Sequence, residues 1–416
     1  MKNMIQFTGK NGEFQIAHLV QQNEWNFPVA NEEGIKSSVT QNFGGDCKLD
    51  QNHFLLEPVS IENLHNNRST RNIWCTVDGK DHYSLTGASA QNEYERFLGK
   101  EDDMVLDAGF MWQEVKRIIK DVELEATVRI FAPLGYGAEV MQVKIVNKGK
   151  DARKISVTPA IPLYGRSADN LRDHRHVTSL LHRIKTSENG VICKPVLSFD
   201  ERGHQKNNMI YYVAGSTENG ENPVSFFPTV ASFIGESGTF LAPEALAKNQ
   251  KGCGAGKEFA GEEALGAMTF AEIMLAPGQA QEYIVVSGMT DSEEEITRTA
   301  EAFHTIHNYI DVEERILRKG AIAAHADEKV LIPINMRDGS VLAVGKGNPE
   351  WNYSAPHGAG RVMSRTKAKQ SIDLEKYKAS MQGIYSTSVN ADTLDEAPMA
   401  YKSLADIMDE IRDSVD

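Results

Sequence analysis

One segment in the last fifth of the chain combines a histidine, small residues and arginines in a pattern suited to phosphate chemistry. Residues 351–365 read WNYSAPHGAGRVMSR. A neutral imidazole is a competent nucleophile toward phosphorus when an acceptor orients its other nitrogen. Here His357 is followed by Gly358, Ala359 and Gly360, and such small residues let a phosphate group come close to the backbone. The residues alone leave two interpretations open: an anion site with a nucleophilic histidine, or a glycine turn with a surface histidine.

Two arginines in the same segment could bring positive charge to that site. Arg361 and Arg365 are four positions apart, so they would share one face if the segment were helical. Each guanidinium is a planar fork that can bind phosphate through two hydrogen bonds. The whole chain has a formal net charge of −14, which is a poor match for a protein that binds nucleic acid over its entire surface. The charge is compatible with one local basic pocket.

Five stretches of the C-terminal part are shared with a known enzyme family. They are HNYID (307–311), LRKGA (317–321), IPINMRDG (332–339), NYSAPHGAGR (352–361) and DEAPMAYK (395–402). Through them, residues 301–416 resemble the C-terminal part of the RtcB family of RNA ligases. The resemblance implies dependence on GTP and manganese (Mn2+). The implied reaction joins an RNA 3′-phosphate, or a 2′,3′-cyclic phosphate, to a 5′-hydroxyl.

The same resemblance implies a role for each of several residues. His357 would be the catalytic residue that accepts GMP, and covalent catalysis of this kind divides one difficult step into easier ones. The remaining implied roles are guanylate binding by Asn335 and Ser340, phosphate contact by Gly358, Ala359 and Gly360, metal binding by His307, and contact with RNA phosphate by Arg361 and Arg365.

The sequence also departs from the family pattern. The family's other metal ligands include an Asp and a Cys in a D-x-x-C motif and two further histidines in its N-terminal part, but here Asp46 is adjacent to Cys47. The family's final segment with a guanine-binding lysine is also expected to be missing. One imidazole cannot satisfy the coordination of a divalent ion. We therefore expect an incomplete α+β fragment that keeps the nucleophile but lacks most of the metal site.

The N-terminal part shares stretches with a different family. They are FPVANEEGI (27–35), LHNNRSTRN (64–72), GFMW (109–112) and YGRSADNLRDHRHVTSLLHR (164–183). By these, residues 1–300 resemble the β-supersandwich domain of glycoside hydrolase family 94, in particular phosphorylases of β-linked gluco-oligosaccharides. In that family the domain packs against a helical barrel with the catalytic aspartate, and no barrel is found here. The resemblance implies a β-gluco-oligosaccharide as ligand, without phosphorolysis by this chain.

Some polar and aromatic residues of this N-terminal part could bind ligands. His174 and His176 would point the same way on a strand and could bind a metal, although a hydrogen-bonded loop at an interface is the preferred interpretation. Trp74 and Trp112 could stack on sugar rings, but a tryptophan in a β-sandwich is more often part of the core.

Local patterns predict the elements that must position these residues. Residues 139–146 and 154–158 alternate between apolar and polar residues, as do residues 125–131, which predicts strands. The glycine-containing connection between the first two predicts that they form a hairpin. A capping box at Ser292 predicts a helix to about Phe303, and a last helix is predicted from Ser403, with Leu404, Ile407, Met408 and Ile411 on its buried face.

Composition places the protein in a broad class. The chain has 416 residues and four widely spaced cysteines, which suits a reducing cytoplasm better than a disulfide framework. Neither a signal peptide nor an apolar run of membrane-spanning length is present. The predicted fold is a mainly β supersandwich at 1–300, followed by the RtcB-like fragment at 301–416. Three functions stay open: an RNA ligase completed by an oligomer or a missing partner domain, a carbohydrate-binding or glucan phosphorylase-related module that lacks its catalytic barrel, and an inactive join of two truncated proteins.

Overall fold

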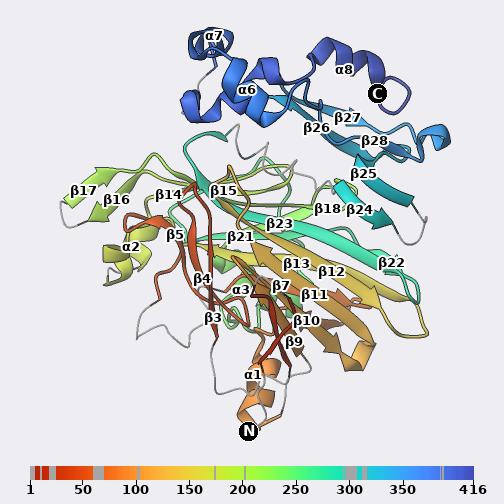
Figure 1. Cartoon of the computed structure of the whole chain (residues 1–416). Coiled ribbons are helices and arrows are strands. Elements are labelled where there is room, and N and C mark those ends of the chain that lie inside the picture. Colours follow the sequence, from red (N-terminus) through yellow and green to blue (C-terminus); the bar gives the residue numbers. More distant parts are fainter. Residues whose placement is uncertain are drawn as a thin grey trace. The chain divides into compact units, whose positions relative to one another are not determined.

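The chain forms two compact units, Met1–Glu301 and Ala302–Asp416. The computed structural model (Figure 1) describes residues 5–9, 12–17, 25–59, 70–100, 104–172, 175–200, 203–293, 296, 307–311, 316–384, 386 and 388–416. In these ranges the first unit is built mainly of antiparallel strands, while the second combines short strands with short helices. The prediction of a mainly β fold followed by an α+β part is therefore confirmed.

The largest sheet among the described residues belongs to the first unit and has 11 strands. In spatial order these are β1 (Ile5–Phe7), β2 (Phe14–Ala17), β9 (Met104–Gly109), β10 (Trp112–Ile119), β11 (Leu124–Phe131), β12 (Ala138–Asn147), β23 (Ala280–Thr290), β18 (Ile210–Thr217), β15 (Gly190–Pro195), β14 (His182–Thr186) and β20 (Glu258–Ala260). The predicted alternation in β12 is confirmed, because Met141, Val143 and Ile145 are buried while Lys144 is exposed.

A second large sheet faces the first across a shared core. Its strands are β19 (Ser225–Thr229), β21 (Ala264–Thr269), β13 (Arg153–Leu163), β7 (Asn72–Val77) and β8 (Asp81–Ser84), with β22 (Ile273–Leu275) paired to β13. Met141 and Val143 of β12 belong to the same apolar cluster as Ile155 and Val157 of β13. The two sheets therefore form a sandwich whose inner faces exclude water together.

The hairpin predicted between residues 139–146 and 154–158 is wrong. β12 pairs with β11 and β23, whereas β13 pairs with β7, β21 and β22 in the other sheet. Asn147, at the end of β12, donates to the carbonyls of Asp151 and Leu275 at 2.8 Å each. The chain thus turns across the sandwich here, because each strand buries its apolar side in the common core rather than beside its sequence neighbour.

Smaller elements complete the first unit. They are the four-stranded sheet β3 (Asn26–Ala30), β4 (Lys36–Thr40), β5 (Cys47–Asp50) and β6 (His53–Leu56), the pair β16 (Leu197–Asp200) and β17 (Gly203–Lys206), the helices α1 (Ala90–Phe97), α2 (Arg175–Ser179), α3 (Val230–Ile234) and α4 (Glu244–Ala247), and the 3-10 turns η2 (Lys120–Val122) and η3 (Ala168–Arg172). Arg71 links the turn before β5 to β12, since it pairs with Glu139 at 2.8 Å and both side chains are fully buried.

The second unit contains two small sheets. One has the order β24 (His307–Asp311), β25 (Ile316–Ala323) and β28 (Ser354–Pro356), and the other is the hairpin of β26 (Lys329–Asn335) and β27 (Gly339–Val344). Val330, Ile332 and Ile334 alternate into the core of this unit, and Ile407 and Ile411 pack on them. The opposite face of the hairpin exposes Leu331, Leu342 and Val344.

Short helices and turns follow the strands of the second unit. They are η4 (Pro349–Trp351), α6 (Arg365–Ser371), α7 (Leu374–Ser380), η5 (Ala391–Glu396), η6 (Pro398–Ala400) and α8 (Leu404–Glu410). The predicted helix from Ser403 is confirmed, with the Ser403 side chain accepting from the amide of Asp406. Met408 is 42% exposed, so its predicted burial is wrong, because Leu404, Ile407 and Ile411 pack against the cluster that contains the hairpin.

Two further expectations can be placed against the described residues. Most of the helix predicted from Ser292 to about Phe303 lies outside them. In the part of the chain that is described, no helix is both long and apolar enough to cross a membrane.

Candidate functional site

His357 follows directly after β28, a short strand at the edge of a sheet. β28 pairs with β25 through Ala321–Pro356, Ile322–Ala355 and Ala323–Ser354. Ala355 is buried and fixes the strand in the core, while His357 is exposed. The histidine therefore sits on a loop whose entrance is anchored by a strand, with its ring accessible from solvent.

The glycines after His357 shape the loop. Gly360 has a φ of 71°, which is the left-handed region where a side chain is strained, and a Cβ placed there would meet no atom within 4 Å. A Cβ on Gly358 would lie 3.3 Å from the carbonyl oxygen of Pro333. The backbone thus turns sharply with open space beside Gly360, which is the kind of surface that a phosphate group can approach.

Hydrogen bonds fix this loop on two sides. The amide of Ala359 donates to the carbonyl of Pro333 on β26 at 2.9 Å. Three residues later the amide of Val362 donates to the carbonyl of Ala400 at 2.9 Å, and the amide of Lys402 donates to the carbonyl of Gly360 at 3.2 Å. The loop is therefore held between the β26–β27 hairpin and the segment 400–402.

The hairpin also positions Asn335 and Ser340. Ser340 is the register partner of Pro333, the residue that accepts from Ala359, so it lies next to the glycine loop. Asn335 closes the tight turn, since its side chain accepts from the amides of Arg337 and Asp338 at 3.0 Å each. The structure thus brings Ser340, Asn335 and the glycine loop to one end of the hairpin. Their predicted roles in binding guanylate stay predictions.

His307 lies in the same sheet as the strand before His357. On β24 it is the register partner of Ile322, which on its other side pairs with Ala355. Neighbouring strands are about 4.8 Å apart, so the backbone of His307 lies roughly 10 Å from that of Ala355. The side chain of His307 lies outside the described part of the structure, and its predicted role as a metal ligand stays a prediction.

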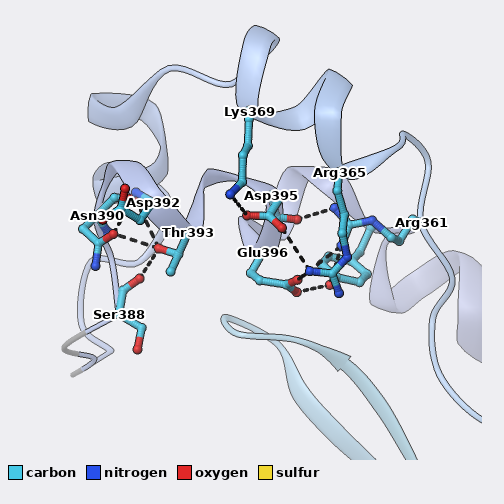
Figure 2. Close-up of polar contacts among 10 residues, drawn as sticks. Arg361, Arg365, Lys369, Ser388, Asn390, Asp392, Thr393, Asp395 and Glu396 are labelled. Carbon is cyan, nitrogen blue, oxygen red and sulfur yellow. Dashed lines mark hydrogen bonds and ion pairs between the residues drawn. The ribbon is translucent and has the colours of Figure 1, made fainter.

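Arg361 and Arg365 lie in a cluster of charged residues (Figure 2). Arg361 contacts the hydroxyl of Tyr401 at 2.8 Å and the carboxylate of Glu396 at 3.6 Å, and it donates to the backbone carbonyl of Asp395. Arg365 pairs with Asp395 at 3.0 Å and Glu396 at 2.7 Å. Both predicted phosphate contacts thus have acidic partners within the protein.

The cluster changes the ionisation of its members. Burial opposes the charge on Asp395, but hydrogen bonds from its backbone amide, Lys369 and Arg365 outweigh it and hold the pKa of this carboxyl below its ordinary value. The Glu396 carboxylate raises the pKa of the Arg365 guanidinium. Burial, followed by the hydrogen bond to Glu396, raises the pKa of Tyr401. Asp395 and Arg365 therefore stay charged at neutral pH, while Tyr401 stays neutral.

The described residues do not fit a manganese site. Among them, no group of three or more His, Cys, Asp and Glu side chains converges as metal ligands. The carboxylates of Asp395 and Glu396 are paired with Arg361, Arg365 and Lys369. The backbone of the loop, by contrast, has room for a phosphate group beside Gly360.

Sequence reasoning did not foresee the acidic partners of the arginines. Asp395, Glu396 and Tyr401 belong to the stretch 395–402, which carries the resemblance but was given no role. The sequence feature that could have revealed this pairing is the presence of two adjacent acidic residues in the same unit as the two arginines of the candidate site. The distance of about thirty residues along the chain hid the pairing, because opposite charges are matched in space and not in sequence.

In the first unit, the candidate residues take different positions. Trp74 is buried in an apolar cluster, while Trp112 is partly exposed and lies against the guanidinium of Arg129, 5.2 Å from the ring centre. The side chains of His174 and His176 lie outside the described part. A small polar pocket is lined by Glu57, Pro162, Leu163, Tyr164, Arg166, Val230, Phe240, Glu263 and Ala264.

Comparisons with known proteins show similarity for both parts of the chain. The family model "tRNA-splicing ligase RtcB" matches residues 275–415. The RNA-splicing ligase RtcB of Escherichia coli (strain K12) is 37% identical over 118 residues, which are 27% of this chain and 29% of that ligase. The tRNA-splicing ligase RtcB of Aeropyrum pernix is 40% identical over 82 residues, covering 18% of this chain and 17% of that ligase. The chain thus spans less than a third of the length of these ligases.

Solved structures resemble the chain only loosely. A GalM/aldose epimerase homologue from C. elegans has a TM-score of 0.35 and 9% identity, covering 64% of this chain and 99% of that one. A bacterial glucoamylase complexed with acarbose has a TM-score of 0.36 and 9% identity, covering 69% of this chain and 36% of that one.

The two family matches overlap at residues 275–306, where β23 pairs with β12 and β18 and so lies within the sandwich. The C-terminal part therefore resembles RtcB ligases. The family model "Glycosyl hydrolase 94, supersandwich domain" matches residues 70–306, which are more than half of this chain. The chain therefore belongs to the glycosyl hydrolase 94 supersandwich-domain family.

Proposed function

We propose that the second unit transfers guanylate from GTP to His357 as the first step of RNA ligation of the RtcB type. In this step the unprotonated imidazole nitrogen of His357 attacks the α-phosphorus, the bond to the pyrophosphate leaving group breaks, and the proton on the other ring nitrogen can pass to solvent. The observation that carries the proposal is the loop geometry: an exposed histidine beside an open glycine turn that is fixed to the Asn335–Ser340 hairpin end.

The later steps of the proposed reaction use the same histidine. The guanylate passes from His357 to an RNA 3′-phosphate and forms an anhydride there. A 5′-hydroxyl then attacks this phosphorus, its proton is lost, and GMP leaves. Gly358, Ala359 and Gly360 would face the phosphates of GTP. Arg365 is the first residue of α6, after a non-helical segment, and its side chain is 68% exposed. We propose that the reaction takes place in the cytoplasm, because the four cysteines of the chain are free thiols and that compartment is reducing.

We further propose that this activity needs ligands from a partner polypeptide. The family resemblance implies Mn2+, but among the described residues no three metal-ligating side chains converge, so no step is assigned to a metal within this chain. The exposed face of the hairpin, with Leu331, Leu342 and Val344, offers apolar area for such a partner. The partner would supply what the E. coli ligase has outside the 29% that this chain spans.

Guanylylation tests the proposal directly. The full chain is incubated with labelled GTP and Mn2+, alone and with the non-matching part of the E. coli ligase, and is then separated on a denaturing gel. Label on this chain that disappears in His357→Asn supports the proposal. His325→Asn is the matched control, because His325 is a second solvent-accessible histidine of the same unit, bonded to Glu328. Absence of label with and without the added fragment, in a folded protein, refutes it.

A second function is favoured by the polar pocket of the first unit. Glu57, Tyr164 and Arg166 are all buried, and together with Glu263 they line one small pocket in a supersandwich-family domain. Carboxylates, a guanidinium and a tyrosine ring are the groups that hydrogen-bond and stack on sugars. The pocket itself has room for about one water molecule, so we propose that a β-gluco-oligosaccharide binds across its opening and not inside it. A ligand-dependent rise in melting temperature tests it, because a ligand bound only to the folded state stabilises that state.

A further inference from the structure

We propose that Arg361 is a positioning residue that fixes the loop carrying His357, in place of the contact with RNA phosphate expected from the sequence. The proposal rests on the function proposed for His357. It assigns to Arg361 an action through the loop and leaves contact with RNA phosphate to Arg365.

The donors of Arg361 are directed at groups of the protein itself. Its Nε donates to the carbonyl of Met363 at 3.3 Å, one terminal nitrogen donates to the hydroxyl of Tyr401 at 2.8 Å, and the other donates to the carbonyl of Asp395. The guanidinium also lies over the ring of Tyr401, 4.8 Å from its centre. A guanidinium has five N–H groups, and here all three nitrogens have partners, two of them backbone carbonyls.

The backbone around Arg361 is paired with the same segment. Arg361 and Tyr401 form an antiparallel bridge, and the hydrogen bonds of Val362 and Lys402 lie on either side of it. Side chain and backbone therefore fasten the loop to segment 395–402 together. His357 itself lies between Ala355, which pairs with β25, and Ala359, which is fixed to Pro333, and the attachment at Arg361 follows two residues after Ala359.

Arg365 differs from Arg361 in exposure and in the nature of its partners. Its side chain is 68% exposed, against 23% for Arg361, and its partners are the carboxylates of Asp395 and Glu396. An RNA phosphate can replace a carboxylate partner without breaking the backbone of the loop. Removing Arg361 from its carbonyl partners would leave those carbonyls unpaired, which costs more than an exposed ion pair.

Hydrogen exchange of single amides in the full chain tests the positioning role. Arg361→Met should accelerate exchange at Val362 and Lys402 by about tenfold or more, the factor expected when charge-assisted hydrogen bonds are lost. Arg365→Met is the matched control and should leave these amides within about twofold of the parent, because exposed ion pairs contribute little. The amides of Ile407 and Ile411 on α8 should not change in either variant, which shows that the effect is local.

Rates of guanylylation and affinities for RNA distinguish a positioning role of Arg361 from direct contact with phosphate. In a preparation that takes up label, Arg361→Met should slow guanylylation while the GTP concentration for half-maximal rate stays within about twofold of the parent. Arg361→Lys keeps the positive charge but lacks the planar guanidinium, so its guanylylation rate should lie between those of Arg361→Met and the parent protein.

The proposal is overturned if Arg361→Met leaves exchange at Val362 and Lys402 unchanged and weakens RNA binding as much as Arg365→Met does. If no preparation takes up label, the proposed guanylylation fails, but the exchange experiment still decides whether Arg361 fixes the loop.

Discussion

The buried ion pair of the first unit gives a prediction whose size follows from the structure. Arg71 and Glu139 are both fully buried and joined by two bonds of 2.8 Å, from Nε to one carboxylate oxygen and from a terminal nitrogen to the other. Arg71 also donates to the carbonyls of Phe43 at 3.2 Å and Asp46 at 3.0 Å. The pair therefore fixes the turn before β5 to the middle of the large sheet.

Replacing Arg71 by Met should lower the free energy of unfolding by about 4 kcal/mol. Removing one partner of a buried pair costs roughly 3–5 kcal/mol, because the remaining charge stays buried without compensation. The carbonyls before β5 lose a donor as well. A typical domain has about 5–15 kcal/mol of stability, so the variant should still fold.

Urea unfolding followed by tryptophan fluorescence measures this loss. The Trp351→Phe background removes the tryptophan of the second unit, so that Trp25, Trp74 and Trp112 report on the first unit. Arg153→Met is the matched control, since its pair with Asp78 spans 3.0 Å but is partly exposed, and it should cost less than about 1 kcal/mol. A loss below about 1 kcal/mol in Arg71→Met would refute the reasoning that this buried pair holds the turn.

Four further outcomes are expected. Gly360→Ala should destabilise the second unit by about 1–2 kcal/mol in urea unfolding, because its φ of 71° is unfavourable for a residue with Cβ while space for the methyl is available. The pKa of the Asp395 carboxyl is lowered in the folded state, so its contribution to stability is present above its unfolded pKa of about 4 and is lost as the pH falls below that value. The melting temperature should therefore fall less steeply between pH 6 and pH 2.5 in Asp395→Asn than in the parent protein. Leu342→Lys should reduce binding of an apolar dye at unchanged stability, because Leu342 is 62% exposed. Arg166→Met should abolish any rise in melting temperature caused by β-gluco-oligosaccharides, and an equal rise in both proteins would exclude the pocket as the sugar site.

The sequence was informative where the determinants of structure are local. The alternation in residues 139–146 predicted β12, since burial of every second side chain is a property of the strand itself. Ser403 predicted the start of α8, because a cap acts within one helix turn. Pairing of strands is not local, and the short turn after Asn147 gave no sign that β13 would join the opposite sheet.

The candidate site shows the same division between local and distant information. The order of His357, Gly358, Ala359 and Gly360 indicated an exposed histidine beside an open turn, because glycine conformations are set by the immediate backbone. The partners of Arg361 come from residues 395–401, and nothing in segment 351–365 specifies them. A fork that looked available for phosphate in the sequence is occupied by the protein's own carbonyls in the structure.

The pairing of β12 with β23 has a consequence for the order of events during synthesis. Val140 of β12 lies opposite Val286 of β23, and β23 is also the neighbour of β18, so one late strand joins the two halves of the large sheet. Contacts between residues so distant in the chain form slowly, because the intervening segment must first be ordered. On the ribosome, the sandwich cannot close until the chain has been made to about residue 290. The ligase-like unit is therefore translated while its predecessor is still completing its sheet, a period in which unpaired strand edges and apolar faces of both units are exposed together.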